Sequence, residues 1–156
     1  MWQRIQTVFL AIVALAMIAS MLLPLWVYQA GTENEHALYA LHYTVKEDGT
    51  SNTQYFPYAL TGILAVAVAT VACISISKYT NRLLQRKLGA LSALFMAGEI
   101  FSAFYFSNQL MKSHDAAAQQ YGSGFYLPVI AVIANFLANR FIMRDEKLVR
   151  DADRLR

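Results

Sequence analysis

Four apolar stretches, each about as long as a membrane-spanning helix, constrain this chain more than any other feature. A helix needs about 20 mostly apolar residues to cross a bilayer. We expect spans at about 5–27, 57–77, 88–111 and 124–143. Hydrophobic residues make up 57% of the chain and charged residues 15%, whereas a soluble domain averages roughly 45–50% and about 25%. The expected fold is therefore an all-α membrane protein, a four-transmembrane-helix bundle that forms one domain over 1–156.

The basic residues predict how the spans are oriented, because cytoplasmic loops carry an excess of Lys and Arg. Eleven of the thirteen Lys and Arg residues lie near the two chain ends or in the loop at 78–87. The outer loop at 28–56 holds one lysine and four acids. Both termini are therefore expected in the cytoplasm. The concentration of basic residues on the cytoplasmic side explains the net charge of +3. The charge therefore gives no reason to expect a nucleic-acid partner.

The first outer loop, 28–56, is too long for a simple turn. A β-prone run at 38–45, a turn signal at Asp48-Gly49 and a second run at 50–56 predict a small β-hairpin over the outer helix ends. Four spans with a β-rich first outer loop are similar in layout to the claudins, a likeness that implies no function.

Two further segments are expected to be helical. Residues 116–120 are predicted to prolong the third span before the Gly122-Ser123-Gly124 break. The cytoplasmic tail, 144–156, is highly charged, and its few apolar residues recur at helical spacing. The tail is therefore predicted to continue the fourth span into solvent.

Small residues indicate where the helices pack, because lipid tails do not drive helices together. In the second span they recur four apart and form one stripe, and a similar stripe follows the third span. The residues expected at these helix contacts are Ala65, Ala69, Cys73, Gly89, Ala93 and Ala97. Cys73 is therefore interpreted as a packing residue and not as a nucleophile.

Glu99 is the one ionisable residue deep inside a predicted span. A charge at that depth costs about 2.5–3.5 kcal/mol on insertion scales, so the side chain is expected to face the bundle. No Lys or Arg lies at matching depth, and burial without a cation disfavours the charged form. Thr70 and Asn135 lie about one turn nearer the cytoplasm and are candidates to share a polar contact with Glu99.

Two interpretations of Glu99 stay open. A carboxyl group inside a membrane is by default a functional candidate, here a group that handles protons or cations. The alternative, which we favour, is a hydrogen-bonded glutamic acid that fixes helix register or pairs with a basic residue of a partner subunit. Asn135 and Asn139, four apart on the fourth span, are interpreted as hydrogen-bonding contacts between helices and not as a substrate site.

No catalytic, cofactor-binding or metal-binding motif accompanies these residues. The sequence has no glycine-rich phosphate loop, no His–Glu zinc helix, no CxxC pair and no nucleophile elbow, so an enzyme is not expected. His36 and His42 in the first outer loop lack a third ligand at matching spacing. We therefore expect no metal and no cofactor.

The two ends of the chain carry a recognisable pattern. The start, Met1-Trp2-Gln3-Arg4-Ile5-Gln6-Thr7, and the segment 138–156, which contains Arg-Asp-Glu-Lys-Leu-Val-Arg, resemble a family of small bacterial inner-membrane proteins with four predicted spans, known as a domain of unknown function. The resemblance covers the whole chain in layout and is specific at the two ends. It implies a bacterial plasma-membrane location, with no activity and no catalytic residues.

The expected function is that of a non-enzymatic accessory or assembly subunit of a membrane complex, and the alternative is a small proton-coupled carrier or channel component that uses Glu99. Expected partners are the lipid bilayer, a membrane or cytoplasmic protein, or a second copy of the chain. The residues expected at a cytoplasmic docking surface are Arg4, Arg144, Asp145, Glu146, Lys147, Arg150 and Arg154. The other interpretation is that these residues anchor the chain at the membrane boundary.

Overall fold

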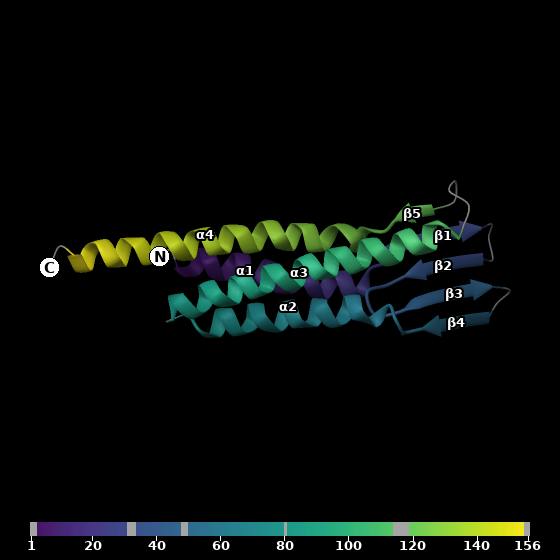
Figure 1. The fold of residues 1–156 in the computed structure, drawn as a ribbon, viewed down its shortest axis with the longest axis horizontal. Helices are drawn as coiled ribbons and strands as arrows, with labels where there is room; N and C mark the ends of the chain where they lie inside the picture. Colours follow the sequence, from purple (N-terminus) through teal and green to yellow (C-terminus); the bar gives the residue numbers. More distant parts are fainter. Residues whose placement is uncertain (1–2, 31–33, 48–49, 80, 114–118, 155–156) are drawn as a thin grey trace.

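The computed structural model describes residues 3–30, 34–47, 50–79, 81–113 and 119–154. These residues form four long helices and a five-stranded antiparallel sheet at one end of the helical bundle (Figure 1). The helices are α1 (Gln3–Leu22), α2 (Ala59–Ser77), α3 (Arg82–Met111) and α4 (Leu127–Arg154), and a short 3-10 helix, η2 (Ser123–Tyr126), precedes α4. The strands are β1 (Trp26–Ala30), β2 (Asn34–Leu38), β3 (Tyr43–Glu47), β4 (Thr50–Gln54) and β5 (Gln119–Tyr121).

The sheet shows that the expectation of an all-α fold with one small hairpin is wrong. Its strand order is β4-β3-β2-β1-β5. The predicted hairpin is present as β3–β4, with Thr44 opposite Thr53, although its turn at 48–49 lies outside the described residues. The run at 38–45 is two strands and not one, because the chain reverses where the Tyr39 N–H donates to the His42 oxygen at 2.8 Å.

Strands β1 and β5 overlap segments predicted as helix. The span expected at 5–27 ends as a helix at Leu22, and Pro24 stands at the break, where a proline disfavours continuation. Trp26 then pairs with both Leu38 and Tyr121. In the segment predicted to prolong the third span, residues 114–118 lie outside the described residues and Gln119–Tyr121 forms β5.

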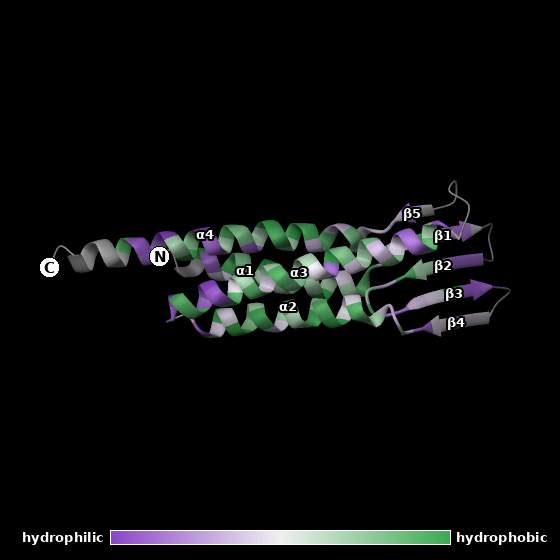
Figure 2. Cartoon of the chain, viewed as in Figure 1, coloured by the Kyte–Doolittle hydropathy of each residue, from purple (hydrophilic) through white to green (hydrophobic). Residues whose placement is uncertain are grey.

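The four helices pack as a ring of neighbours. Helix α1 lies against α2 and α4, and α3 lies against the same two helices. Val13, Met17, Val68 and Met96 fill the centre and are fully buried. Large hydrophobic side chains are also exposed along the helices, whose ribbons are mostly green in Figure 2, and all four helices are long and apolar enough to cross a membrane.

The sheet is fixed to the helix ends by main-chain contacts. The Gly62 N–H in the first turn of α2 donates to the Ala40 oxygen at 2.7 Å, which joins the start of α2 to the turn between β2 and β3. A side chain on Gly62 would meet Leu41. On the other side of the bundle, the N–H groups of Gly122 and Gly124 donate to the oxygens of Leu25 and Pro24, both at 3.0 Å.

Helix α4 continues well past the other three helices (Figure 1). We call the end of the bundle from which it continues the tail end, and the opposite end the sheet end. The helix runs without a break from Leu127 to Arg154, as the helical spacing in the tail predicts. The tail end is hydrophilic and the middle of the bundle is hydrophobic (Figure 2).

Candidate functional site

Glu99 lies in the interior of the bundle and is fully buried, the orientation expected from the cost of inserting a charge. Its Oε1 lies 3.4 Å from Ser20 Oγ of α1. The same Ser20 hydroxyl donates to the Met17 oxygen at 2.8 Å. The single Ser20 hydrogen is therefore shared between the Met17 oxygen and Glu99 Oε1, with Ser20 as the donor to both.

Two more hydroxyl groups lie beside Glu99 toward the sheet end. Ser102 Oγ donates to the Glu99 main-chain oxygen at 2.9 Å, and Thr61 Oγ1 of α2 lies 2.9 Å from Ser102 Oγ. Since the single Ser102 hydrogen is used on Glu99, Thr61 is the donor of that second bond. Glu99 Oε2 has no hydrogen-bond partner among the described residues. We call Ser20, Thr61, Glu99 and Ser102 the Glu99 cluster.

Thr61, and not the predicted Thr70, is the threonine of α2 that lies in the Glu99 cluster. Thr70 is exposed on the outside of α2 and donates to the Val66 oxygen at 2.8 Å. The two threonines are nine residues apart, and about 100° of rotation per residue places them on opposite sides of a helix. The prediction that Thr70 contributes to a polar contact with Glu99 is therefore wrong.

Asn135 and Asn139 pack against Gly89 of α3, nearer the tail end. Asn135 is buried, and its Nδ2 donates to the Gly89 oxygen at 3.0 Å. A side chain on Gly89 would collide with the amide of Asn139. Gly89 lies ten residues from Glu99, about 15 Å along the helix, so the asparagines and the Glu99 cluster are separate polar sites. Asn135 makes the interhelical hydrogen bond that was predicted for it.

The stripe of small residues faces the bundle over part of its length. Ala65 and Gly89 are buried and Ala69 is half-buried, but Cys73, Ala93 and Ala97 are exposed. A step of four residues rotates by about 40° relative to the helix, so a four-apart stripe turns away from a fixed face within a few turns. The packing role predicted for Cys73 within the bundle is therefore wrong, and that of Ala93 and Ala97 is wrong for the same reason.

At the tail end, α3 begins earlier than the apolar run predicts. Asn81 caps the helix, and its Oδ1 accepts from the Leu84 N–H at 3.0 Å, as short polar side chains do at helix starts. Gln85 is buried in the first turns, and its Nε2 donates to the Ser75 oxygen of α2 at 2.9 Å. Sequence reasoning missed Gln85 because 78–87 was assigned to a loop.

The acids of the tail contact α3. Arg82 Nη2 lies 3.1 Å from Asp145 Oδ2, and Arg86 Nη1 donates to Glu146 Oε2 at 3.0 Å. We call these two ion pairs the α3–α4 clamp. Asp145 and Glu146 are therefore engaged within the chain and are not free docking acids. Of the other predicted docking residues, Arg144 and Lys147 are exposed, and the side chains of Arg4, Arg150 and Arg154 lie outside the described part.

The histidines of the first outer loop belong to an aromatic cluster. His36 Nδ1 lies 2.7 Å from the Tyr43 hydroxyl, and His36 Nε2 lies 3.5 Å from Glu47 Oε1. Burial raises the pKa of Tyr43 to about 12. His42 stacks on Tyr39 with ring centroids 4.9 Å apart. No three His, Cys, Asp or Glu side chains gather as a metal site in the part of the chain that the structure describes.

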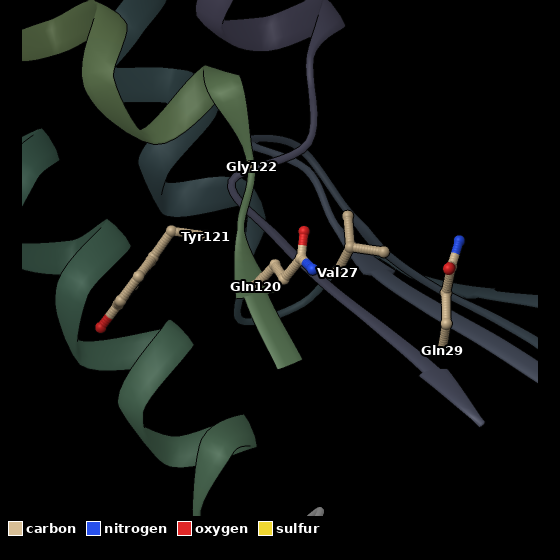
Figure 3. Close-up of a pocket in the computed structure, with 5 residues that line it drawn as sticks. All are labelled: Val27, Gln29, Gln120, Tyr121 and Gly122. Carbon is tan, nitrogen blue, oxygen red and sulfur yellow. The ribbon is translucent and has the colours of Figure 1, made fainter. Parts of the chain in front are cut away.

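A small pocket of about 190 Å³ lies on the sheet where β1 pairs with β5. Figure 3 shows Gln120 beside Val27, its partner in the strand register, whereas Tyr121 points away toward the helices. Gln29 and Gln120 offer amide groups for hydrogen bonding, but no lining group is ionised near neutral pH. The pocket is therefore a weaker candidate for chemistry than the Glu99 cluster.

A family model described as a domain of unknown function, DUF4293, matches residues 2–155. The chain belongs to the DUF4293 family. This match confirms the predicted resemblance to a domain of unknown function. No curated protein matches the chain. The function of this DUF4293 protein must therefore be inferred from its geometry, of which four helices suited to a membrane are the most general feature.

Proposed function

We propose that this DUF4293 protein is a non-enzymatic subunit of a membrane complex and presents the projecting part of α4 to a partner protein. The α3–α4 clamp is the observation that carries the proposal. It joins the first turns of α3 to α4 at Asp145 and Glu146, where α4 leaves the bundle. Arg82 also donates from Nη1 to the Asp145 main-chain oxygen at 3.2 Å, so its guanidinium contacts both the side chain and the backbone of that residue.

The clamp gives the projecting helix a defined direction. Residues 147–154 extend about 12 Å beyond Glu146 at 1.5 Å per residue. An isolated helix of that length is unstable in water, but here it continues a helix that is fixed in the bundle. Acidic and basic residues are mixed in this segment. A helix that lies on a membrane surface is more uniformly basic, so the charge pattern favours a protein partner.

We also propose a membrane location and orientation for the protein. The basic residues concentrate at the tail end, which the positive-inside rule assigns to the cytoplasm. We therefore place the protein in the bacterial inner membrane with both termini in the cytoplasm and the sheet outside. The partner would accordingly be a cytoplasmic protein or the cytoplasmic part of another membrane protein.

Affinity purification in mild detergent, followed by mass spectrometry, tests the proposal. We expect a stoichiometric partner that is lost when residues 147–156 are deleted. A variant with Asp151 and Arg154 exchanged keeps length and net charge and shows whether the charge order matters. An identical set of co-purifying proteins with and without residues 147–156 would contradict the proposal.

A second function is supported by a specific observation in the Glu99 cluster. Glu99 Oε2 lacks a hydrogen-bond partner among the described residues, and the Ser20 hydroxyl lies 3.4 Å from the other carboxyl oxygen. A proton-coupled carrier or channel component would use this carboxyl. Reconstitution into liposomes that contain a pH-sensitive dye tests this function, with Glu99→Gln as the variant and Thr70→Val as the control. Equal proton flux in the Glu99→Gln variant and the parent would exclude it.

A further inference from the structure

A groove follows the outer face of the bundle between α3 and α4. Two adjoining hollows form it and share Ala93. The hollow nearer the middle of the bundle has a volume of about 470 Å³ and is lined by Ala97, Phe104 and Val132 among others. The hollow nearer the tail end has a volume of about 250 Å³, and Arg86 lies at its rim with Asn139. We call both together the α3–α4 groove.

The groove exists because small residues of α3 face outward here. Ala90, Ala93 and Ala97 are exposed, so no other part of the described chain fills the space in front of them. Bulky side chains border it, since Phe101 and Phe104 of α3 are also exposed. In a membrane this face meets lipid, and a hollow of this size leaves room for part of a lipid molecule.

The groove is polar at its tail end and apolar along the rest of its length. A phospholipid has the same arrangement, with a polar headgroup and apolar acyl chains. Arg86 lies at one end, and from Ala93 onward the lining is apolar. The lining on α3 runs from Arg86 to Phe104, eighteen residues or about 27 Å along a helix. The hydrocarbon core is about 30 Å thick, so an acyl chain that starts from a headgroup at Arg86 fits along the apolar part of the groove.

We propose that the α3–α4 groove is a binding site for an anionic phospholipid of the leaflet at the tail end, with an acyl chain along Ala93 and Ala97 and the phosphate at Arg86. Charge complementarity supports this occupant. Arg86 uses Nη1 for Glu146, and a guanidinium has five N–H donors, so others are available to a phosphate. Lys87 and Arg140 are exposed at neighbouring positions and add positive charge. The inference does not require the partner proposed for α4, although Arg86 also belongs to the α3–α4 clamp.

Native mass spectrometry of the full chain tests the site, with phosphatidylglycerol and phosphatidylcholine as probes. We expect the chain to retain phosphatidylglycerol in preference to phosphatidylcholine. Arg86→Gln should weaken phosphatidylglycerol binding about fivefold, the equivalent of about 1 kcal/mol for one cation near an anionic headgroup. Arg86→Lys should restore most of it. Ala97→Leu, which fills the groove, should abolish the preference, whereas Cys73→Leu on the exposed face of α2 should leave it unchanged.

Circular dichroism confirms that each variant is folded before its lipid binding is compared, and Arg86→Gln keeps the test informative if Ala97→Leu does not fold. Unchanged phosphatidylglycerol binding in Arg86→Gln or in folded Ala97→Leu would overturn the proposal. Equal retention of free glycerol phosphate would also overturn it, because the acyl chain would then contribute nothing. A parent protein that forms a dimer, with a monomeric Ala97→Leu variant, would assign the groove to a second copy instead.

Discussion

Arg82 contacts Asp145 twice, through an ion pair to the carboxylate at 3.1 Å and a hydrogen bond to the main-chain oxygen at 3.2 Å. The side chains of Arg82 and Asp145 are 23% and 16% exposed, so the pair is better shielded from water than an ordinary surface ion pair. The contact joins two residues 63 positions apart. It fixes the direction in which α4 leaves the bundle.

Replacing Arg82 should loosen the end of α4. We expect Arg82→Gln to lower the free energy of unfolding by about 1 kcal/mol, because it removes a partly shielded ion pair. Backbone amides of 144–154 should exchange hydrogen faster than in the parent. Arg86→Gln should have a smaller effect, because its partner Glu146 and Arg86 itself are more exposed. Unchanged hydrogen exchange in Arg82→Gln would show that the clamp does not hold the helix.

Gly89 should not tolerate a side chain. A methyl group there would collide with the Asn139 amide, and such overpacking costs about 1–3 kcal/mol. Gly98 is a matched control on the same helix, because a methyl group there would lie at ordinary contact distance, 3.5 Å from Leu64. We expect Gly89→Ala to lower the thermal midpoint in detergent, measured by circular dichroism, and Gly98→Ala to leave it unchanged or higher. Equal midpoints would mean that the Asn139 side chain moves away from the added methyl group at little cost.

Thr61 and Thr70 should respond differently to the same substitution. Thr61→Val removes the donor to Ser102 and should cost about 1 kcal/mol. Thr70→Val removes only a bond to its own helix on the exposed face, so the change should stay within about 0.5 kcal/mol. Chemical unfolding of both variants in the same detergent makes the comparison. A larger loss of unfolding free energy for Thr70→Val would mean that the Thr70 face of α2, and not the Thr61 face, lies toward Glu99.

Tyr43 should make the stability of the sheet end depend on pH in the alkaline range. Burial raises the pKa of Tyr43 from 10.0 to about 12, so the folded state binds this proton more tightly than the unfolded state does. The resulting stabilisation is fully present below about pH 10 and is lost as the pH rises toward 12. The difference in unfolding free energy between the parent and Tyr43→Phe should therefore fall across this range. A constant difference would mean that Tyr43 ionises in the fold as it does in water.

The helices were predictable because hydropathy over about 20 residues is a local signal. The sheet was mostly not predictable. Strand β4 reads Thr-Ser-Asn-Thr-Gln and has no buried side chain, and β5 is three residues long. Strands β4 and β5 form because they pair with β3 and β1. Such pairing depends on residues elsewhere in the chain and is not evident from the few residues of the strand itself.

The candidate site was predictable only in part. The depth of Glu99 follows from its position in an apolar span, and so does its inward orientation. Its partners do not follow, because Ser20 is one of many serines in the sequence and its contact with Glu99 spans 79 positions. Thr70 was chosen over Thr61 by depth alone, and depth does not determine which side of a helix a residue occupies.

The pairing of β1 with β5 also sets an order of assembly. Strand β1 follows α1 directly, whereas β5 lies between α3 and α4. Strands β1 to β4 are complete before the second helix is synthesised, but β1 pairs with β5 only after more than ninety further residues have been made. The last strand of the sheet can therefore pair only after the third helix has been synthesised. This strand connects the segment after the first helix to the segment before the last helix.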